Sequence, residues 1–171
     1  MKDWPATKID LISTEILIPY ARNSRVHSET QVSQLASSIQ EWGFTVPILV
    51  DEENVLIAGH GRLLAAQKLK LDKVPVMVAK GWTEAQKKSY VIADNKLALN
   101  SSWDDEMLEI ELINLEQEKF NIELLGFDLD ELSKLFKTDN TLDAPSEFDE
   151  YDDNIETDKQ CPKCGYTWSG G

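Results

Sequence analysis

A short glycine-rich turn carries the residues of this sequence that are best suited to chemistry. It reads Ala58-Gly59-His60-Gly61-Arg62 and joins an apolar run to an amphipathic one. Glycines let the backbone turn sharply and approach a ligand closely, and the free N–H groups of a helix start favour an anion. Arg62 can donate two hydrogen bonds to a phosphate, and His60 can add a donor or carry a proton. The turn predicts a phosphate site, although a Gly-x-Gly-Arg turn can also serve only to connect a strand and a helix.

A pair of cysteines near the C-terminus forms a second candidate site. Cys161 and Cys164 are the only cysteines, and Gly165 follows them. Two thiolates at this spacing are typical of a zinc knuckle. A structural zinc needs four ligands, and the only histidines, His27 and His60, lie far upstream. The pair therefore predicts a zinc shared between two chains or completed by a partner protein, and a remnant without metal is the alternative.

Hydrophobic periodicity places the turn in an α/β domain. Alternating residues predict a strand at 8–12, and further strands are expected at 46–50, 55–58 and 74–78, the middle two as a hairpin. A capping box of Ser28 and Gln31 opens a helix that ends at Gly43, and His27 before it is expected in an exposed loop. Two more helices are expected at 62–69 and 83–99.

The C-terminal third has a different composition. Residues 100–137 predict an acidic helical extension with helices capped by Ser102 or Asp104 and by Asp128. Residues 138–160 are acidic and poor in aliphatic side chains, which predicts a disordered linker. Residues 161–171 form a separate tail that holds the two cysteines.

Charge is unevenly distributed along the chain, whose net charge is −14. Basic residues outnumber acidic ones between positions 60 and 100, whereas acidic residues dominate from 101 onward. The basic centre suits an anionic ligand, and plain solvated helix faces are the alternative. We expect no membrane span and no signal peptide, and with so few cysteines the reducing cytoplasm of a bacterial host is the expected location.

The order of several short motifs is more specific than any one of them. An Asn23-x-Arg25 loop precedes a helix that ends in Gly43-Phe44-x-x-Pro47, and the Ala58-Gly59-x-x-Arg62 turn and an Ala93-Asp94-Asn95 helix follow. This order, over residues 9–99, resembles the ParB N-terminal domain family. The resemblance implies the ParB/sulfiredoxin-like α/β (α+β) fold, a small mixed sheet with surrounding helices. It also implies a domain at 8–99 that binds CTP, ATP or ADP.

The resemblance implies roles for ten positions. Asn23 and Arg25 match the loop that approaches the nucleotide, and Thr45 and Pro47 match a ligand-facing segment. The phosphate cradle matches Gly59, Gly61 and Arg62, with His60 between the glycines. Asp94 and Asn95 match an acid–amide pair that contacts phosphate or its Mg²⁺, for which a carboxylate oxygen is a suitable ligand.

Departures from the family pattern narrow the function. Segregation proteins of the family carry Gly-Glu-Arg-Arg at this turn, whereas this chain has Gly59-His60-Gly61-Arg62. The resemblance therefore does not decide between CTP and ATP as the ligand. Sulfiredoxins place a cysteine after the glycines, and this chain has none there, so sulfinic-acid reduction is not expected. Segregation proteins continue into a basic helix-turn-helix, whereas residues 101–137 are acidic and suit phosphate contact poorly. A role in chromosome partition is therefore not expected.

A closer likeness extends to Phe136. The segments Ile18 to Asn23, Trp82 to Lys87 and Leu124 to Phe127 resemble the ParB-like module that precedes the catalytic domain of some phage and bacterial DNA-modification methyltransferases. The chain contains no methyltransferase motif, so we expect the accessory module on its own.

The leading hypothesis is a nucleotide-binding, DNA-associated accessory protein of a phage, prophage or other mobile element, linked to DNA modification or DNA metabolism. Its expected partners are a nucleoside triphosphate with Mg²⁺, DNA directly or through another protein, a DNA methyltransferase and a second copy of the chain. One alternative is an enzyme, either a nucleotide-dependent phosphotransferase or a ParB-like nuclease, in which His60 or Asp94 takes part in the chemistry. Another is a docking scaffold for a methyltransferase or packaging protein. The sequence predicts no catalytic residue.

Overall fold

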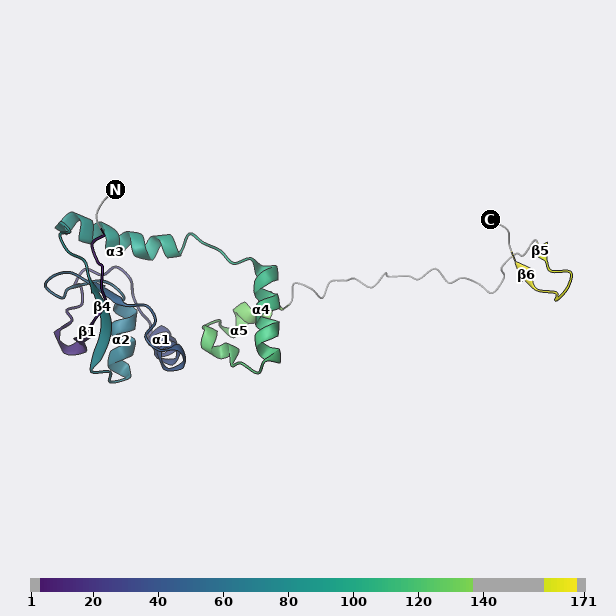
Figure 1. Cartoon of the computed structure of the whole chain (residues 1–171), viewed down its shortest axis with the longest axis horizontal. Coiled ribbons are helices and arrows are strands. Elements are labelled where there is room, and N and C mark those ends of the chain that lie inside the picture. The colour runs from purple at the N-terminus through teal and green to yellow at the C-terminus, as the bar shows by residue number, and fades with distance from the viewer. Residues whose placement is uncertain (1–3, 137–158, 169–171) are drawn as a thin grey trace. The chain divides into compact units, whose positions relative to one another are not determined.

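The computed structural model describes residues 4–136 and 159–168. The chain divides into two units, Met1–Phe136 and Lys137–Gly171 (Figure 1). The predicted linker at 138–160 lies outside the described residues except for its last two positions, which belong to a short strand. No helix within the described ranges has the length and apolar character that crossing a bilayer requires.

A four-stranded mixed sheet forms the centre of the first unit. Its strands are β1 (Asp10–Ser13), β2 (Ile48–Val50), β3 (Leu56–Ala58) and β4 (Lys73–Val78), in the order β1-β4-β2-β3. Strand β4 runs antiparallel to β1 and parallel to β2, and β2 and β3 pair as an antiparallel hairpin. The small mixed sheet with surrounding helices and the hairpin are confirmed.

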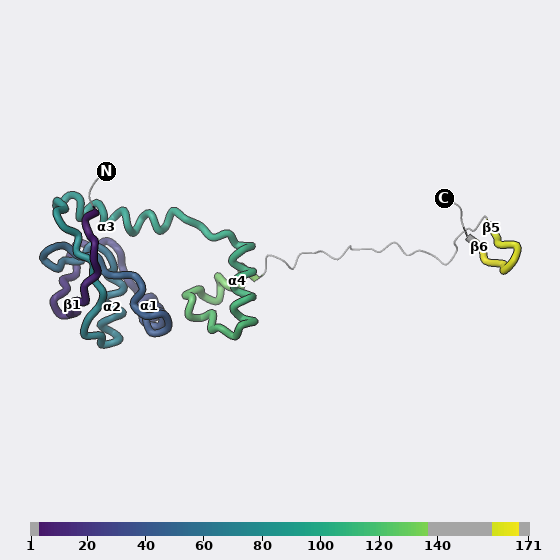
Figure 2. The backbone as a smooth tube through the Cα atoms, in the orientation of Figure 1, coloured from purple at the N-terminus to yellow at the C-terminus, as the bar shows by residue number. Residues whose placement is uncertain are grey.

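Three helices accompany the sheet, and their capping residues set where they begin. They are α1 (Glu29–Trp42), α2 (His60–Lys68) and α3 (Glu84–Ala98), and their course is easiest to follow as a tube (Figure 2). Thr83 and Gln86 form the full capping box at α3. At α1 only half of the predicted box forms, because Gln31 Oε1 lies 2.9 Å from His27 Nδ1 and does not return to the cap. Helix α2 starts two residues earlier than predicted, with Gly59 as its N-cap.

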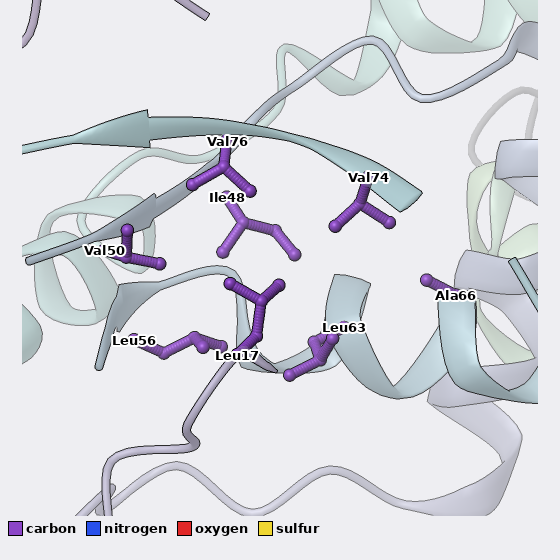
Figure 3. Packing of buried hydrophobic residues seen from close by; sticks show 8 residues of the cluster. All are labelled: Leu17, Ile48, Val50, Leu56, Leu63, Ala66, Val74 and Val76. Carbon is purple, nitrogen blue, oxygen red and sulfur yellow. The ribbon is translucent and has the colours of Figure 1, made fainter. Parts of the chain in front are cut away.

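The main core lies between the sheet and α2. Val74 and Val76 of β4 face Leu63 and Ala66 of α2, and Leu17 enters from the segment after η1 (Thr14–Ile16) (Figure 3). The cluster is completed by Ile48, Val50 and Leu56. Burying these aliphatic side chains fixes the strands and the first turn of α2 in one rigid body. The turn that carries the candidate chemistry therefore stands on a packed base.

The acidic segment folds into α4 (Asp105–Gln117), η2 (Ile122–Leu125) and α5 (Leu129–Leu135). Asp104 and Asp128 cap the two helices, as predicted. This segment contacts α1, since Gln34 Nε2 donates to Gly126 O at 3.2 Å and the rings of Trp42 and Phe120 stack with centroids 6.0 Å apart. In the second unit, β5 (Lys159–Gln160) and β6 (Thr167–Trp168) pair as a hairpin.

Asp51 holds together the hairpin turn and α3. Its carboxylate is buried, and one oxygen accepts the backbone N–H groups of Val55 (2.8 Å) and Glu53 (3.0 Å). The other oxygen pairs with Lys87 Nζ of α3 at 2.8 Å. Burial raises the pKa of Asp51, but the hydrogen bonds from Lys87, Val55 and Glu53 outweigh it and leave the pKa below its ordinary value. The carboxylate therefore fixes α3 against the sheet.

Replacing Asp51 by alanine should lower the free energy of unfolding by about 2 to 4 kcal/mol, since two turn N–H groups lose their acceptor. Asp51→Asn should cost less, because an amide oxygen still accepts both bonds. Urea unfolding measures both values. The control is Glu53→Gln, whose side chain is 70% exposed and whose loss should cost within about 0.5 kcal/mol. Equal effects for Asp51→Ala and Glu53→Gln would contradict the anchoring role.

Candidate functional site

Gly59 is required at the turn for two reasons. Its φ is +97°, in the left-handed region that side chains disfavour. A Cβ there would lie 2.9 Å from Nη2 of Arg62 and 3.3 Å from Cγ1 of Ile48. The missing side chain thus leaves room for the guanidinium of Arg62 to fold back over the turn. It also leaves the first N–H groups of α2 without a side-chain cap.

The Arg62 guanidinium is mostly buried and only partly hydrogen-bonded. Its Nη2 donates to the Pro47 carbonyl at 3.2 Å, whereas its buried Nε has no hydrogen-bond partner among the described residues. Burial lowers the pKa of Arg62, and the nearby carboxylate of Asp94 opposes that shift. A buried donor without an acceptor is costly and uncommon in folded proteins. The arrangement favours an anionic acceptor at this place.

Gly61 lets α1 and the segment before it approach α2. A Cβ on Gly61 would lie 2.9 Å from Leu35 Cδ1 and 3.1 Å from the ring of His27. His27 therefore packs against the turn, contrary to the expectation of an exposed loop. The only sign of this close approach in the sequence is Gly61 itself, whose missing side chain leaves space beside α2.

His60 serves as an acceptor for the chain before the Asn23 loop. Its Nε2 accepts the backbone N–H of Tyr20 at 3.2 Å, so the neutral ring carries its proton on Nδ1. Burial lowers the pKa of His60, and the charge of His27 lowers it further. The ring is therefore neutral at pH 7 and ties the Tyr20 segment to the turn.

A cavity of about 150 Å³ lies at the N-terminal end of α2. It brings together residues from the Asn23 loop, the Gly59 turn and α3, which are far apart in the sequence. Seven of the ten predicted site residues line it: Asn23, Gly59, His60, Gly61, Arg62, Asp94 and Asn95. Its other lining residues, His27, Leu35 and Ala58, were not predicted.

The three remaining predicted positions lie differently. Arg25 lines a neighbouring cavity of about 480 Å³ that shares Asn95 with the first and also includes Lys96. Pro47 takes part through its carbonyl, which accepts from Arg62. Thr45 is exposed and lines neither cavity. Asn23 holds Arg25 in place, since its side chain makes two hydrogen bonds of 3.2 Å with the Arg25 backbone.

A separate cavity of about 300 Å³ lies beside the Asp51 anchor and is less suited to a charged ligand. Its lining holds two lysines, Lys87 and Lys88, against three carboxylates, and Lys87 already pairs with Asp51 at 2.8 Å and with Glu84 at 3.0 Å. Cys161 and Cys164, the predicted metal ligands, lie in the second unit. Within the described residues, no group of three or more potential metal ligands is placed to hold an ion.

The fold and the glycine turn define the ParB/sulfiredoxin-like class, and comparison with known proteins gives the family. Residues 2–95 match the ParB N-terminal domain model, so the chain belongs to that family. Residues 106–162, which include η2, α5 and all of α4 except its first residue, match the ParB-methyltransferase HTH domain. The predicted likeness to the ParB-like module of methyltransferases is confirmed. The acidic composition of residues 101–137 gave no indication that this segment matches a helix-turn-helix domain.

The ParB-like nuclease domain-containing protein YnaK of Escherichia coli (strain K12) is 55% identical over 71 residues, which are 42% of this chain and 82% of YnaK. The C-terminally truncated chromosome-partitioning protein ParB from Caulobacter crescentus, complexed with CTP-γ-S, shares the fold with a TM-score of 0.58 and 23% identity. That match covers 70% of this chain and 69% of the ParB chain. Sulfiredoxin from Arabidopsis thaliana aligns with a TM-score of 0.43 and 26% identity, over 50% of this chain and 98% of that chain.

The lowered pKa of His60 predicts a pH dependence of stability. Below the ordinary histidine pKa of 6.5, the unfolded chain binds a proton that the native ring resists, so the free energy of unfolding should fall as pH drops. His60→Gln, whose amide oxygen can still accept from Tyr20, should lose this component. Thermal unfolding between about pH 7.5 and 5.5 measures it, with His27→Gln as the control that keeps most of the slope. An unchanged slope in His60→Gln would exclude His60 as its source.

Proposed function

We propose that the chain binds a nucleoside triphosphate, CTP or ATP, together with Mg²⁺ at the Gly59–Arg62 turn. In this proposal the bound nucleotide controls association with DNA or with a DNA-modification partner. The observation that carries the proposal is the buried Arg62 Nε, which lacks an acceptor at the edge of a cavity lined by the predicted residues. A phosphate oxygen is the acceptor that a guanidinium and a helix N-terminus both favour.

Each residue around the cavity has a role in this proposal. The uncapped N–H groups at the start of α2 and Arg62 hold phosphate oxygens. Asn95 lines the cavity, and because its Nδ2 donates to Val91 O at 2.7 Å, its amide oxygen is the atom left for the ligand. Asp94 is exposed at the rim and can hold Mg²⁺ that keeps most of its waters.

The size of the cavity is consistent with these phosphate-binding roles. About 150 Å³ is small for a whole ligand, since ligand pockets span roughly 300–1,000 Å³. The phosphates alone suit this space, and the neighbouring cavity of about 480 Å³ is available to the rest of the nucleotide. Arg25 and Lys96 line that second cavity and add positive charge. The Caulobacter ParB of the same fold was seen with CTP-γ-S, which supports a nucleotide and leaves the base preference of this chain open.

The switch would act through the segment from Tyr20 to Arg25. This segment is tied to the turn by the Tyr20–His60 bond and is braced internally by Asn23. A nucleotide that contacts Asn23 and Arg62 together would favour the arrangement in which these two groups converge. Such differential contact is what a ligand needs in order to shift a conformational equilibrium.

The negative charge of the acidic helices favours an association with DNA through another protein rather than by direct contact. Residues 101–136 contain eleven acidic side chains and only Lys119 and Lys134 as bases. DNA phosphates are repelled by such a surface. We therefore propose that the segment matching the ParB-methyltransferase HTH domain docks on a modification protein, such as a DNA methyltransferase of a phage or another mobile element in a bacterial cytoplasm.

A thermal-shift panel with CTP, ATP, ADP and GTP in Mg²⁺ tests the nucleotide site. At about 100 times its dissociation constant, a true ligand should stabilise the protein by roughly 2.7 kcal/mol and raise Tm by several degrees. Arg62→Ala should abolish this ligand-induced shift, and Asp94→Asn should reduce its Mg²⁺-dependent part. A flat panel for the wild-type chain would reject the nucleotide proposal and leave the docking scaffold as the better reading.

The matched control is Arg22→Ala. Arg22 is an exposed arginine of the same loop, and it lines neither cavity. The ligand-induced shift of this variant should equal that of the wild type. Because Arg62 also donates to Pro47, the informative value is the difference in Tm with and without nucleotide, rather than the Tm itself.

Measurements of turnover distinguish a nucleotide-controlled switch from an enzyme. The similarity to YnaK, a ParB-like nuclease domain-containing protein, supports the enzyme as an alternative. A switch should hold the nucleotide or hydrolyse it slowly, and should neither phosphorylate a small acceptor nor cut DNA. Release of phosphate, transfer to acceptors and plasmid cleavage can be measured in the same Mg²⁺ buffer. Cleavage or transfer that is lost in Asp94→Asn or His60→Gln would favour the enzyme.

A further inference from the structure

The second unit contains a tight hairpin whose turn holds both cysteines. Strands β5 and β6 pair Lys159 with Trp168 and Gln160 with Thr167. Cys161 N–H donates to Tyr166 O at 2.8 Å, and Gly165 N–H donates to Cys161 O at 2.9 Å. Gly165 has a φ of +74°, the left-handed conformation that lets the chain reverse after Cys164. The turn thus brings two thiols close together.

Backbone donors also point at the first thiol. The N–H groups of Lys163 and Cys164 hydrogen-bond to the sulfur of Cys161, as does the side chain of Cys164. The backbone of the turn therefore faces the Cys161 sulfur, and the Cys164 side chain lies beside it, in the arrangement of a two-thiolate metal knuckle.

The hairpin buries little apolar surface between residues 159 and 167. Apart from the partly buried Cys161, the residues from 159 to 167 are exposed, so no apolar core forms within them. An isolated two-stranded hairpin is marginal in water, and very small units need a disulfide, a metal or association. Both cysteines are free thiols. A metal bound by the two sulfurs would supply a cross-link of this kind.

We propose that Cys161 and Cys164 form half of a four-thiolate zinc site and that the same turn of a second copy of this chain completes it. The 171 residues contain no third cysteine, so a four-thiolate site needs two cysteines from outside them. The two histidines are engaged elsewhere, His27 with Gln31 and His60 with Tyr20. A second copy offers an identical pair of thiolates, and two such pairs related by a twofold axis give the tetrahedral Cys₄ set of structural zinc.

Zinc content and mass of the full-length protein test this proposal. The chain is produced in zinc-replete medium, kept reduced and dialysed against metal-free buffer. We expect one zinc for every two chains and a dimer by light scattering, which a strong chelator converts to monomer. Titration of the stripped protein with Co²⁺ should give intense tetrahedral thiolate absorption that saturates at one ion per two chains.

Cys161→Ser and Cys164→Ser should each reduce bound zinc to background and yield a monomer. Lys163→Ala is the matched control, because it keeps the backbone N–H that faces Cys161 and should retain both zinc and dimer. One zinc per monomer, metal-free protein from zinc-replete cells, or a dimer that persists in Cys161→Ser would each overturn the shared site. The site has no residue in common with the cavity at Arg62, so the nucleotide response of the Cys→Ser variants tells a failure of one proposal from a failure of the other.

Discussion

The site depends on one constraint, the accommodation of the Arg62 guanidinium against a turn that has no side chain at Gly59. The guanidinium reaches Pro47 O at 3.2 Å across space that a Cβ on Gly59 would fill. This contact joins the start of α2 to the residue before β2, and the aliphatic cluster beneath it holds both elements in place. A buried cation with one donor unmatched is an unfavourable arrangement by itself. An anion beside the Arg62 Nε would complete the arrangement.

Much of the fold follows from local sequence signals. Ser28, Thr83, Asp104 and Asp128 fix helix starts because their side chains accept a backbone N–H that would otherwise lack a partner. The hairpin follows from two apolar runs around a polar turn. Strand order does not, because placing β4 between β1 and β2 depends on long-range pairing that no local pattern encodes. The 3₁₀ segments were likewise invisible, since a single turn leaves no periodicity.

The site residues that belong to a sequence motif could be predicted, whereas those that reach the cavity only through tertiary packing could not. The Gly59–Arg62 turn and the Asp94–Asn95 pair lie together at one cavity, as the family resemblance implied. His27 and Leu35 were missed because they reach the cavity only through the space beside Gly61, a contact between α2 and the region of α1. Arg25 lines the adjacent cavity since the Asn23 side chain bonds to its backbone and fixes the local turn.

Charge segregation relates the two halves of the first unit to different partners. Residues 60–100, which supply half of the residues lining the cavity, contain eight basic and three acidic side chains, whereas the helices after position 100 are strongly acidic. Like charges within the acidic segment repel one another, and salt or a basic partner relieves that repulsion. A phosphate ligand suits the first region and a basic protein surface suits the second. Because Gln34 of α1 bonds to Gly126 beyond α4, and Leu35 beside it lines the cavity, helix α1 contacts both regions and joins them physically.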